Sequence, residues 1–273
     1  MTELNDHELL VQYASAESEA AFATLVARYV NLVYSAALRF TGNPHHAEEI
    51  TQAVFIVLAR KAGSLRTGTV LSGWLYQTAR LTAANFVKSE IRRQRREQEA
   101  YMQSTLTEPE SAAWEQIAPL LDESMGRLGE TDRNAVVLRF FENKTSQEVC
   151  ATLKLNEAAA HKRVSRALEK LLKFLAKRGV TLTATVIVGA VTAHSVQAAP
   201  TGLAVTVTAA AKGAAVSATM TTLVQGTLKI MTYAKLKLAL CISMGILLAG
   251  SAVTIYSSLP NNVAAAKFEF EAD

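Results

Sequence analysis

The chain has few cysteines, and the two it has are far apart. Cys150 and Cys241 each sit within an apolar pattern. Two distant thiols form neither a disulfide framework nor a cysteine zinc site, and they are typical of buried or lipid-facing thiols in a reducing compartment. The stretch up to Glu19 is polar and acidic and lacks the apolar core of a signal peptide, so we expect this part to stay in the cytoplasm.

Motifs for catalysis and cofactor binding are also absent. The sequence has no Gly-rich phosphate loop, no nucleophile paired with a base and no metal-ligand spacing. One group of side chains is a candidate metal site: His45, His46, Glu48 and Glu49. Adjacent residues on a helix point about 100° apart, so a solvated helix face explains this group better. We therefore expect no catalytic residue, no cofactor and no metal, which disfavours a membrane enzyme.

Charge is nearly absent from the last third of the chain. Only five of the 28 Lys and Arg residues lie beyond residue 180, whereas four cluster between Arg92 and Arg96. The net charge of +4 does not by itself indicate nucleic acid, but this asymmetry predicts different surroundings for the two parts. The N-terminal part also lacks strand patterns with alternating hydrophobicity, so we expect it to be all-α.

Residues 145–175 have the pattern of a helix-turn-helix. Thr145 and Glu148 form a capping box for a first helix, and Asn156 is a good N-cap for a second. One face of the second helix is apolar, and basic residues lie near its start, where a recognition helix enters the major groove. The apolar residues are Ala160, Val164, Leu168, Leu171 and Leu175, and the opposite face carries His161, Lys162, Arg163, Ser165 and Arg166. The pattern favours DNA binding, with a helical hairpin bearing a solvated basic face as the alternative.

Two amphipathic helices are expected before residue 64. The first covers residues 19–40 and stops at Gly42, which has the character of a C′ residue. The second begins with Asn43 as N-cap and Pro44 at N1, and it closes at Gly63. Each helix carries apolar residues at helical spacing on one face, which predicts a small bundle.

A third helix is expected to start at Ser72 and to run to about Ile91. Trp74 and Tyr76 stand near its start, and basic residues follow along it. Interleaved rings and cations suit a single-stranded DNA surface, because rings stack on bases and cations contact phosphates. Core aromatics followed by a solvated basic end fit the same pattern, and the chemistry alone does not choose between the two.

Three runs in this order resemble a bacterial RNA polymerase sigma factor of the extracytoplasmic-function (ECF) type. They are residues 48–55 (Glu-Glu-Ile-Thr-Gln-Ala-Val-Phe), residues 73–80 (Gly-Trp-Leu-Tyr-Gln-Thr-Ala-Arg) and the helix-turn-helix. The resemblance covers roughly residues 5–178. It implies two small helical domains, a sigma region 2-like bundle and a sigma region 4-like helix-turn-helix.

The resemblance also implies roles for the first bundle. Its second helix would dock on the β′ subunit of core polymerase through Glu48, Glu49, Gln52 and Phe55. Its third helix would recognise and melt the minus-ten promoter element through Trp74, Tyr76, Arg80, Lys88, Arg92 and Arg93. Two departures bear on these roles. Ala53 stands where the family usually has an acidic residue, and Leu81 stands where Asn is common.

The second domain follows a linker at residues 97–112, which has no apolar periodicity. Helices starting near Trp114 and at Thr131 lead into the helix-turn-helix. By resemblance this domain reads the minus-thirty-five element through Thr145, Asn156, His161, Lys162, Arg163 and Arg166. His161 stands where the family often has Lys, so we expect it to contribute little at neutral pH.

Residues 238–259 run for about 22 residues without a charge, and ~20 apolar residues suffice to cross a bilayer. Lys235 and Lys237 precede the run, so the positive-inside rule leaves the preceding domains in the cytoplasm. A buried helix of a third soluble domain is the alternative. The segment before it, residues 179–234, is rich in Ala, Thr and Val, and we expect weakly structured helices there, near a membrane surface.

The expected architecture is therefore all-α, with a single C-terminal transmembrane helix. The expected domains are 1–96 (region 2-like), 97–112 (linker), 113–178 (region 4-like), 179–234 (low charge), 235–259 (transmembrane) and 260–273 (tail). The expected function is promoter recognition and transcription initiation with core RNA polymerase (its β and β′ subunits) on promoter DNA, controlled by membrane tethering or by an anti-sigma factor. A membrane-anchored helix-turn-helix regulator is the alternative, and it has no need of a polymerase docking helix.

Overall fold

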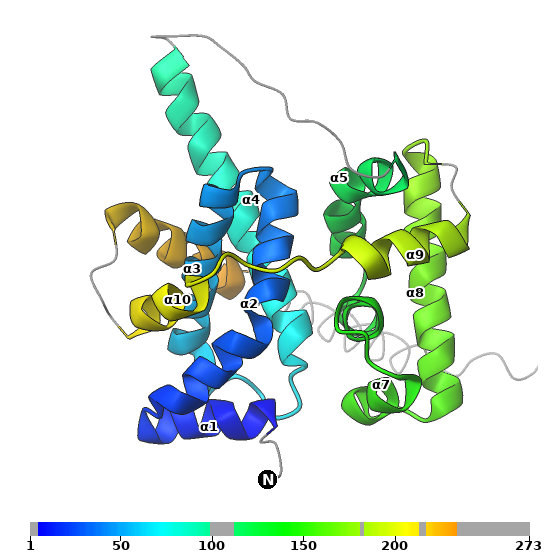
Figure 1. The fold of residues 1–273 in the computed structure, drawn as a ribbon, viewed down its shortest axis with the longest axis horizontal. Helices are drawn as coiled ribbons and strands as arrows, with labels where there is room; N and C mark the ends of the chain where they lie inside the picture. Colours follow the sequence, from blue (N-terminus) through cyan, green and yellow to red (C-terminus); the bar gives the residue numbers. More distant parts are fainter. Residues whose placement is uncertain (1–4, 99–111, 181–182, 213–216, 234–273) are drawn as a thin grey trace, which may run out of the picture. The chain divides into compact units, whose positions relative to one another are not determined.

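The structure, a computed structural model, describes residues 5–98, 112–180, 183–212 and 217–233 (Figure 1). All regular secondary structure within these ranges is helical. The all-α class expected from the sequence is therefore confirmed for the described part of the chain. The 238–259 run predicted to cross a membrane lies outside it, as does Cys241, while Cys150 is half-buried.

The first domain is a bundle of four helices. These are α1 (Asp6–Ala16), α2 (Glu19–Thr41), α3 (Pro44–Lys61) and α4 (Leu71–Gln98), with a short 3-10 turn, η1 (Ala62–Ser64), after α3. The long α2 packs against α1, α3 and α4 (Figure 1). Among the described helices it is the one long and apolar enough to span a membrane by length and composition, but 67% of its apolar window is buried inside the structure. The bundle closes around fully buried side chains that include Phe22, Leu25, Ile50 and Leu75.

Local signals place most helix ends in this bundle. Gly42 adopts φ 62°, and its amide donates to the carbonyl oxygen of Leu38 at 2.7 Å. Asn43 then caps α3 by accepting from the amide of His46 at 3.2 Å. The helix α1 was not predicted, although Asn5 and Glu8 form a capping box in front of it. The fourth helix runs to Gln98, beyond the expected end near residue 91, because Arg, Gln and Glu are good helix formers.

The second domain contains four helical segments and one π-helical turn. They are α5 (Ala112–Arg127), α6 (Glu130–Val136), the π turn η2 (Val137–Phe141), α7 (Ser146–Leu153) and α8 (Glu157–Lys177). The expectation that Thr131 caps α6 is wrong, because Gly129 occupies the N-cap. Glu130 and Asp132 instead place negative charge in the first turn, where the helix dipole favours it.

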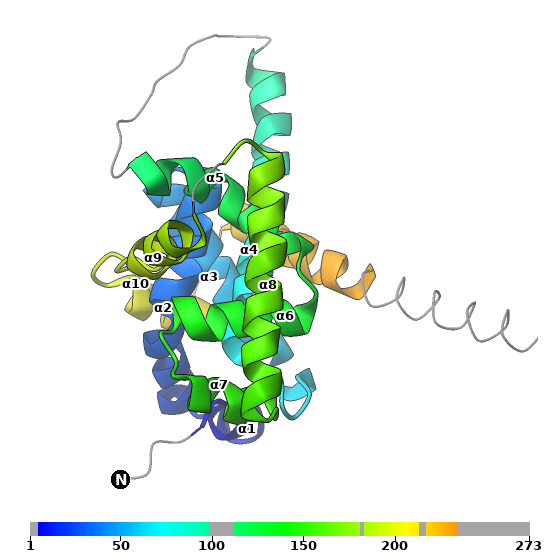
Figure 2. The same cartoon turned by 90° about the vertical axis from the view of Figure 1, so that its right-hand side faces the viewer.

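Beyond the second domain lie α9 (Ala184–His194), α10 (Leu203–Ala211) and a helix at residues 218–233. Small-residue helices were expected here, and their buried side chains face protein. The helix α9 packs on α5 and η2, whereas α10 packs on α2 and α3. Figure 1 shows the chain leaving α9, crossing α2 without helical structure and continuing into α10, and Figure 2 gives the same molecule from the side of α8.

Candidate nucleic-acid and polymerase interfaces

The helix-turn-helix is built from one capping box, one left-handed residue and a second N-cap. The hydroxyl of Thr145 accepts from the amide of Glu148 at 3.3 Å, and the carboxylate of Glu148 accepts from the amide of Thr145 at 2.7 Å. Lys154 adopts φ 54° and ends α7. Asn156 then starts α8 by accepting from the amide of Ala159 at 2.8 Å. The predicted caps are confirmed, and the side chains of Thr145 and Asn156 are engaged in capping α7 and α8.

The helix α8 presents part of its predicted basic face to solvent. His161, Lys162 and Arg166 are exposed near its start. His161 Nε2 lies 4.0 Å from a carboxylate oxygen of Glu157. Because α8 buries Ala160, Leu171 and Leu175 on the other side, its orientation is set by packing within the domain, and Lys162 and Arg166 point away from the core.

Arg163 differs from its neighbours because it bonds within the domain. Its Nη1 donates to Asp132 of α6 at 3.1 Å, and Lys170 donates to the other carboxylate oxygen at 2.5 Å. Burial alone would raise the pKa of Asp132, but hydrogen bonds from Lys170 and Arg163 outweigh it and lower that pKa. The carboxylate therefore stays ionised and ties α8 to α6, so Arg163 serves the domain as well as the predicted DNA surface.

The predicted minus-ten residues of α4 are largely covered. Tyr76 is fully buried, and Trp74 is half-buried. Arg80 lies against α5, since a Cβ placed on Gly126 would come within 2.6 Å of its guanidinium nitrogen. Lys88 is exposed. Arg92 and Arg93 lie on the last turns of α4, and their side chains fall outside the described part. In this conformation Tyr76 belongs to the core, which is one of the two interpretations left open by the sequence.

The predicted polymerase-docking helix α3 is also covered. Glu48, Glu49 and Gln52 are half-buried, while Phe55 is fully buried. All six residues from Ala53 to Leu58 are at most 5% exposed. Six consecutive residues point in every direction around a helix, so this part of α3 is enclosed on all sides. Ala53 has no exposure at all, so an acidic residue there would place its charge inside the protein.

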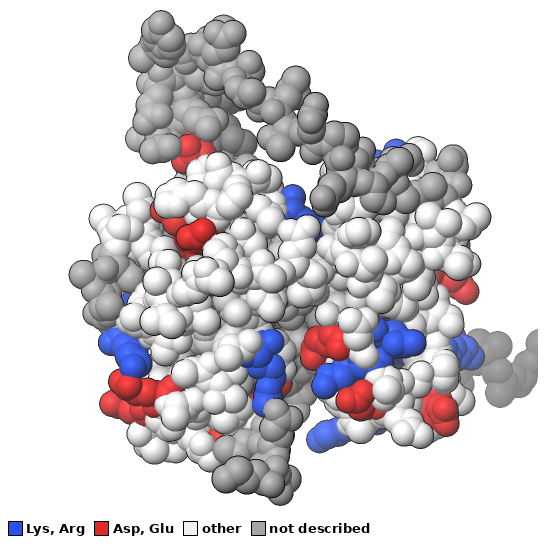
Figure 3. All heavy atoms as spheres, in the orientation of Figure 1, with Lys and Arg blue, Asp and Glu red and all other residues white. Residues whose placement is uncertain are grey.

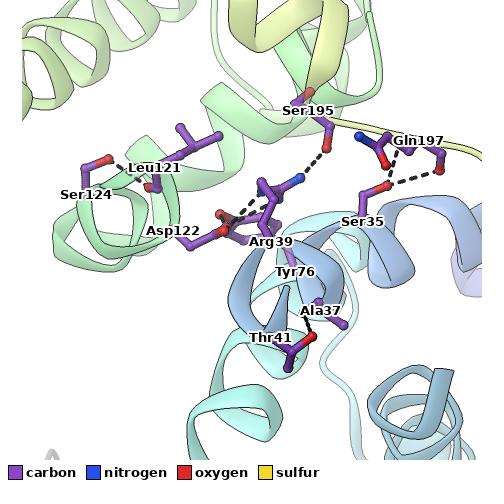
Figure 4. A network of polar contacts seen from close by, with 10 residues as sticks. All are labelled: Ser35, Ala37, Arg39, Thr41, Tyr76, Leu121, Asp122, Ser124, Ser195 and Gln197. Carbon is purple, nitrogen blue, oxygen red and sulfur yellow. Dashed lines mark hydrogen bonds and ion pairs between the residues drawn. The ribbon is translucent and has the colours of Figure 1, made fainter. Parts of the chain in front are cut away.

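A buried polar cluster joins the two domains, and sequence reasoning missed it (Figure 4). Arg39 of α2 forms an ion pair with Asp122 of α5, and the hydroxyl of Tyr76 donates to the same carboxylate. Burial and the charge of Asp122 raise the pKa of Tyr76 well above its ordinary value, so the phenol remains a donor. No local pattern marks these residues, because Arg39 and Asp122 lie 83 positions apart.

Comparison with known proteins identifies the two domains. The Sigma-70 region 2 family model matches residues 25–97, and the Sigma-70 region 4 model matches residues 119–171. The RNA polymerase sigma factor CarQ of Myxococcus xanthus is 31% identical over 163 residues, which make up 58% of this chain and 91% of CarQ. The chain belongs to the sigma-70 family of RNA polymerase sigma factors.

Other relatives of this sigma factor bear ECF names. The ECF RNA polymerase sigma factor SigE of Mycolicibacterium smegmatis is 32% identical over 160 residues, which cover 56% of this chain and 61% of SigE. A solved structure of the sigma factor RpoE in complex with the anti-sigma factor NepR from Bartonella quintana matches at 20% identity and a TM-score of 0.26, covering 61% of this chain and 98% of RpoE. The family is of ECF type, and its members are initiation factors and not enzymes. The resemblance stated from three short runs is therefore confirmed, and the second of the two family matches ends at residue 171.

Proposed function

We propose that this sigma factor binds core RNA polymerase through α3, reads and melts the minus-ten element with α4, and reads the minus-thirty-five element with α8. The observation that carries the proposal is the exposed pair Lys162 and Arg166 at the start of a capped recognition helix. Side chains at this place reach base edges in a major groove, while phosphate contacts add affinity that falls with salt.

The proposed domain limits are those expected from the sequence. Residues 1–96 form the region 2-like domain, residues 97–112 the linker, and residues 113–178 the region 4-like domain. The carboxylates of Glu48 and Glu49, with Gln52 beside them, supply the polar part of the polymerase contact. Trp74 and Arg80 supply stacking and phosphate contacts to the minus-ten strand once the face of α4 is free.

A membrane anchor forms the second part of the proposal. Residues 238–259 carry no charge over about 22 positions, and Lys235 and Lys237 stand on the side predicted to face the cytoplasm. We expect the full chain to sediment with membranes and to be released by detergent but not by high salt. A chain that stays wholly in the soluble fraction after gentle lysis contradicts the anchor and leaves the sigma activity untouched.

Run-off transcription tests the sigma activity. The full chain in nanodiscs is titrated into core polymerase on a promoter template, together with the double variant K162A/R166A and the control K173A, an exposed lysine further along α8. We expect start-site-specific transcripts from the wild type and K173A, and their loss in K162A/R166A. A chain that binds DNA but neither binds core polymerase nor produces transcripts at any concentration is a membrane-anchored regulator instead.

A further inference from the structure

The segment after α9 is bonded to α2 along a regular ladder. Ser195 to Ala199, which we call the strap, cross α2 (Figure 4 shows two of its residues). Arg39 donates to the carbonyl oxygen of Ser195. Ser35 accepts from the amide of Gln197 at 2.6 Å and donates to its carbonyl oxygen at 3.1 Å. Asn31 accepts from the amide of Ala199 at 2.9 Å. The strap thus runs antiparallel to α2.

The distance between successive rungs of the ladder is nearly the same along α2 and along the strap. The three α2 residues are four positions apart, which is a rise of about 6 Å along a helix. Their strap partners are two positions apart, which is about 6.6 Å in extended chain. Each α2 side chain therefore reaches its partner in the strap without strain. The backbone polar groups of the strap, which in an ordinary surface loop would face water, form hydrogen bonds with α2 instead. A regular match of this kind distinguishes a docked segment from one that merely lies on the surface.

After the strap, α10 covers α3 and α2. Leu203 and Val207 are its buried residues, whereas Val205 is 73% exposed on the same helix. Lys212 at its C-terminal end forms an ion pair with Glu19 at the start of α2. Because α10 contacts α3 as well as α2, it covers part of the helix that we propose docks on polymerase.

The helix before the strap and the helix after α10 also pack against the two sigma domains. Before the strap, α9 buries Ile187 and Val191 against the second domain, and the surface over it is largely uncharged in Figure 3. After α10, the helix at residues 218–233 meets α4. The fully buried Thr227 donates to the hydroxyl of Thr82 at 3.2 Å, and a Cβ on Gly226 would come within 2.4 Å of Asn85. Residues 183–212 and 217–228 therefore contact both sigma domains.

We infer that the described residues 183–212 and 217–228 are an intramolecular inhibitor, which we call the clamp. The clamp competes with core polymerase for α3 and keeps the DNA face of α4 against the second domain. The inference rests on the proposed function. Two contacts show how closely that face is covered. Tyr76 bonds to Asp122 of α5, and a Cβ on Gly73 would lie 1.9 Å from the side-chain oxygen of Asn134 in α6.

The clamp acts from within the same chain, which determines its strength. A tethered segment has an effective concentration on the order of millimolar, so a modest intrinsic affinity keeps it bound. Core polymerase must displace the clamp before it can bind α3, so the docked clamp lowers the apparent affinity of the chain for core polymerase. Any event that removes the clamp raises that affinity by the factor by which docking had lowered it. The helix α8 lies outside this competition, since Lys162 and Arg166 are exposed while the clamp is docked. The clamp therefore controls polymerase binding and minus-ten contacts but leaves the predicted minus-thirty-five surface open.

A release experiment uses the full chain in nanodiscs. V207D places a charge at a buried position of α10, and V205D places the same charge at its exposed position. We expect V207D to bind core polymerase at least tenfold more tightly than the wild type, with V205D unchanged. Hydrogen exchange over residues 203–211 reports release of the helix, and L203D/V207D is used if V207D alone stays docked. Released α10 with unchanged core affinity overturns the inference while the sigma function stands.

A lock experiment moves the equilibrium in the opposite direction. In S35C/Q197C the two cysteines stand at the middle rung of the ladder, where Ser35 Oγ lies 2.6 Å from the backbone nitrogen of Gln197. Oxidation that joins the strap to α2 is verified by mass spectrometry of the linked peptides before core binding is measured. We expect the oxidised variant to lose core binding at least tenfold and to regain it with reductant, whereas oxidised wild type, with its native Cys150 and Cys241, does not change. A locked variant that binds core normally overturns the clamp. If no variant binds core in any state, the proposed function fails and the inference fails with it.

Discussion

Arg39 and Asp122 hold the two sigma domains together through a two-point ion pair. Arg39 Nε lies 3.0 Å from Oδ2 of Asp122, and Nη2 lies 3.3 Å from Oδ1. The two side chains are only 7% and 6% exposed. Burial alone would lower the pKa of Arg39, but the charge of Asp122 and the hydrogen bonds of the guanidinium with Asp122 and Tyr76 raise it. The guanidinium stays charged, so the closed arrangement depends on its carboxylate partner.

Removal of that carboxylate should open the domain contact. In D122N the closed form would hold an uncompensated guanidinium, a defect that costs about 3 kcal/mol or more in a buried pair. Separation of the domains returns Arg39 to water and avoids this cost. We expect faster hydrogen exchange in α4 and α5 and a lower urea midpoint.

The matched control for this variant is E123Q on the next residue of α5. Glu123 pairs with Arg127 at 3.2 Å and Arg178 at 2.6 Å, and its side chain is 40% exposed. Exposed pairs contribute about 1 kcal/mol or less, so E123Q should leave α4 protected. Equal exchange in D122N and E123Q would contradict a structural role for the buried pair.

Glu142 should make stability depend on pH. It follows η2, and one of its carboxylate oxygens is buried with no hydrogen-bond partner among the residues that the structure describes. Burial and nearby Asp6 raise its pKa, while a hydrogen bond from Ser72 and the charges of Lys144 and Arg28 lower it, and the net shift is upward from the ordinary 4.5. The folded state holds the proton more tightly, so the stabilising contribution is present at low pH and is lost as pH rises above 4.5 through the raised value.

The variant E142Q tests this dependence because it keeps the shape of the side chain without the charge. We expect the free energy of unfolding at pH 7 to rise by about 1 kcal/mol, at the low end of the cost of an unpaired buried group. The rise should disappear as the buffer approaches pH 4.5, the ordinary value. Urea titrations from pH 4 to pH 8 give the profile, with E169Q on the exposed side of α8 as the control for loss of one carboxylate. A difference between E142Q and wild type that does not vary with pH would rule out this explanation.

Thr145 should stabilise the helix-turn-helix through its cap. T145A removes the acceptor for the amide of Glu148 and should cost about 1 kcal/mol of unfolding free energy. Thr152 on the same helix is exposed, and its hydroxyl only donates back to the carbonyl oxygen of Glu148 at 2.7 Å. T152A should therefore lie within about 0.5 kcal/mol of wild type, since Ala is the better helix former. Thermal unfolding of both variants, measured side by side, checks the ranking.

Substitutions of the exposed cations of α8 should distinguish contacts to DNA bases from contacts to DNA phosphates. A base contact by Arg166 should be worth about 1–3 kcal/mol in R166A and should reduce discrimination between promoter and altered sequences. A phosphate contact by Lys162 should appear in K162A as weaker binding to every sequence, with the slope of log affinity against log salt smaller by about one. Fluorescence anisotropy at several salt concentrations measures both. K173A is the control, and a loss in K173A equal to that in R166A would contradict the assignment of the recognition face.

Features that depend on neighbours three or four residues away could be predicted from the sequence. The cap of Thr145 with Glu148, the stop at Gly42 and the start at Asn43 all appear as expected. The capping box of Asn5 and Glu8 carried the same signal and was overlooked, so α1 was missed. Hydrogen bonds of this kind close within one turn, so the residue types and their spacing are sufficient to specify them.

By itself, then, the sequence determined the helices, the order of the two sigma domains and the basic start of α8. Only the tertiary structure decided that Tyr76 is buried against Asp122, 46 positions away, and that Ser35 bonds to Gln197, 162 positions away. Aromatic and basic residues on α4 suit DNA as well as a protein partner, because burial of the rings and pairing of the charges stabilise either contact. Which partner they meet in this chain depends on how distant helices pack, and in this structure α5 and α6 cover that surface.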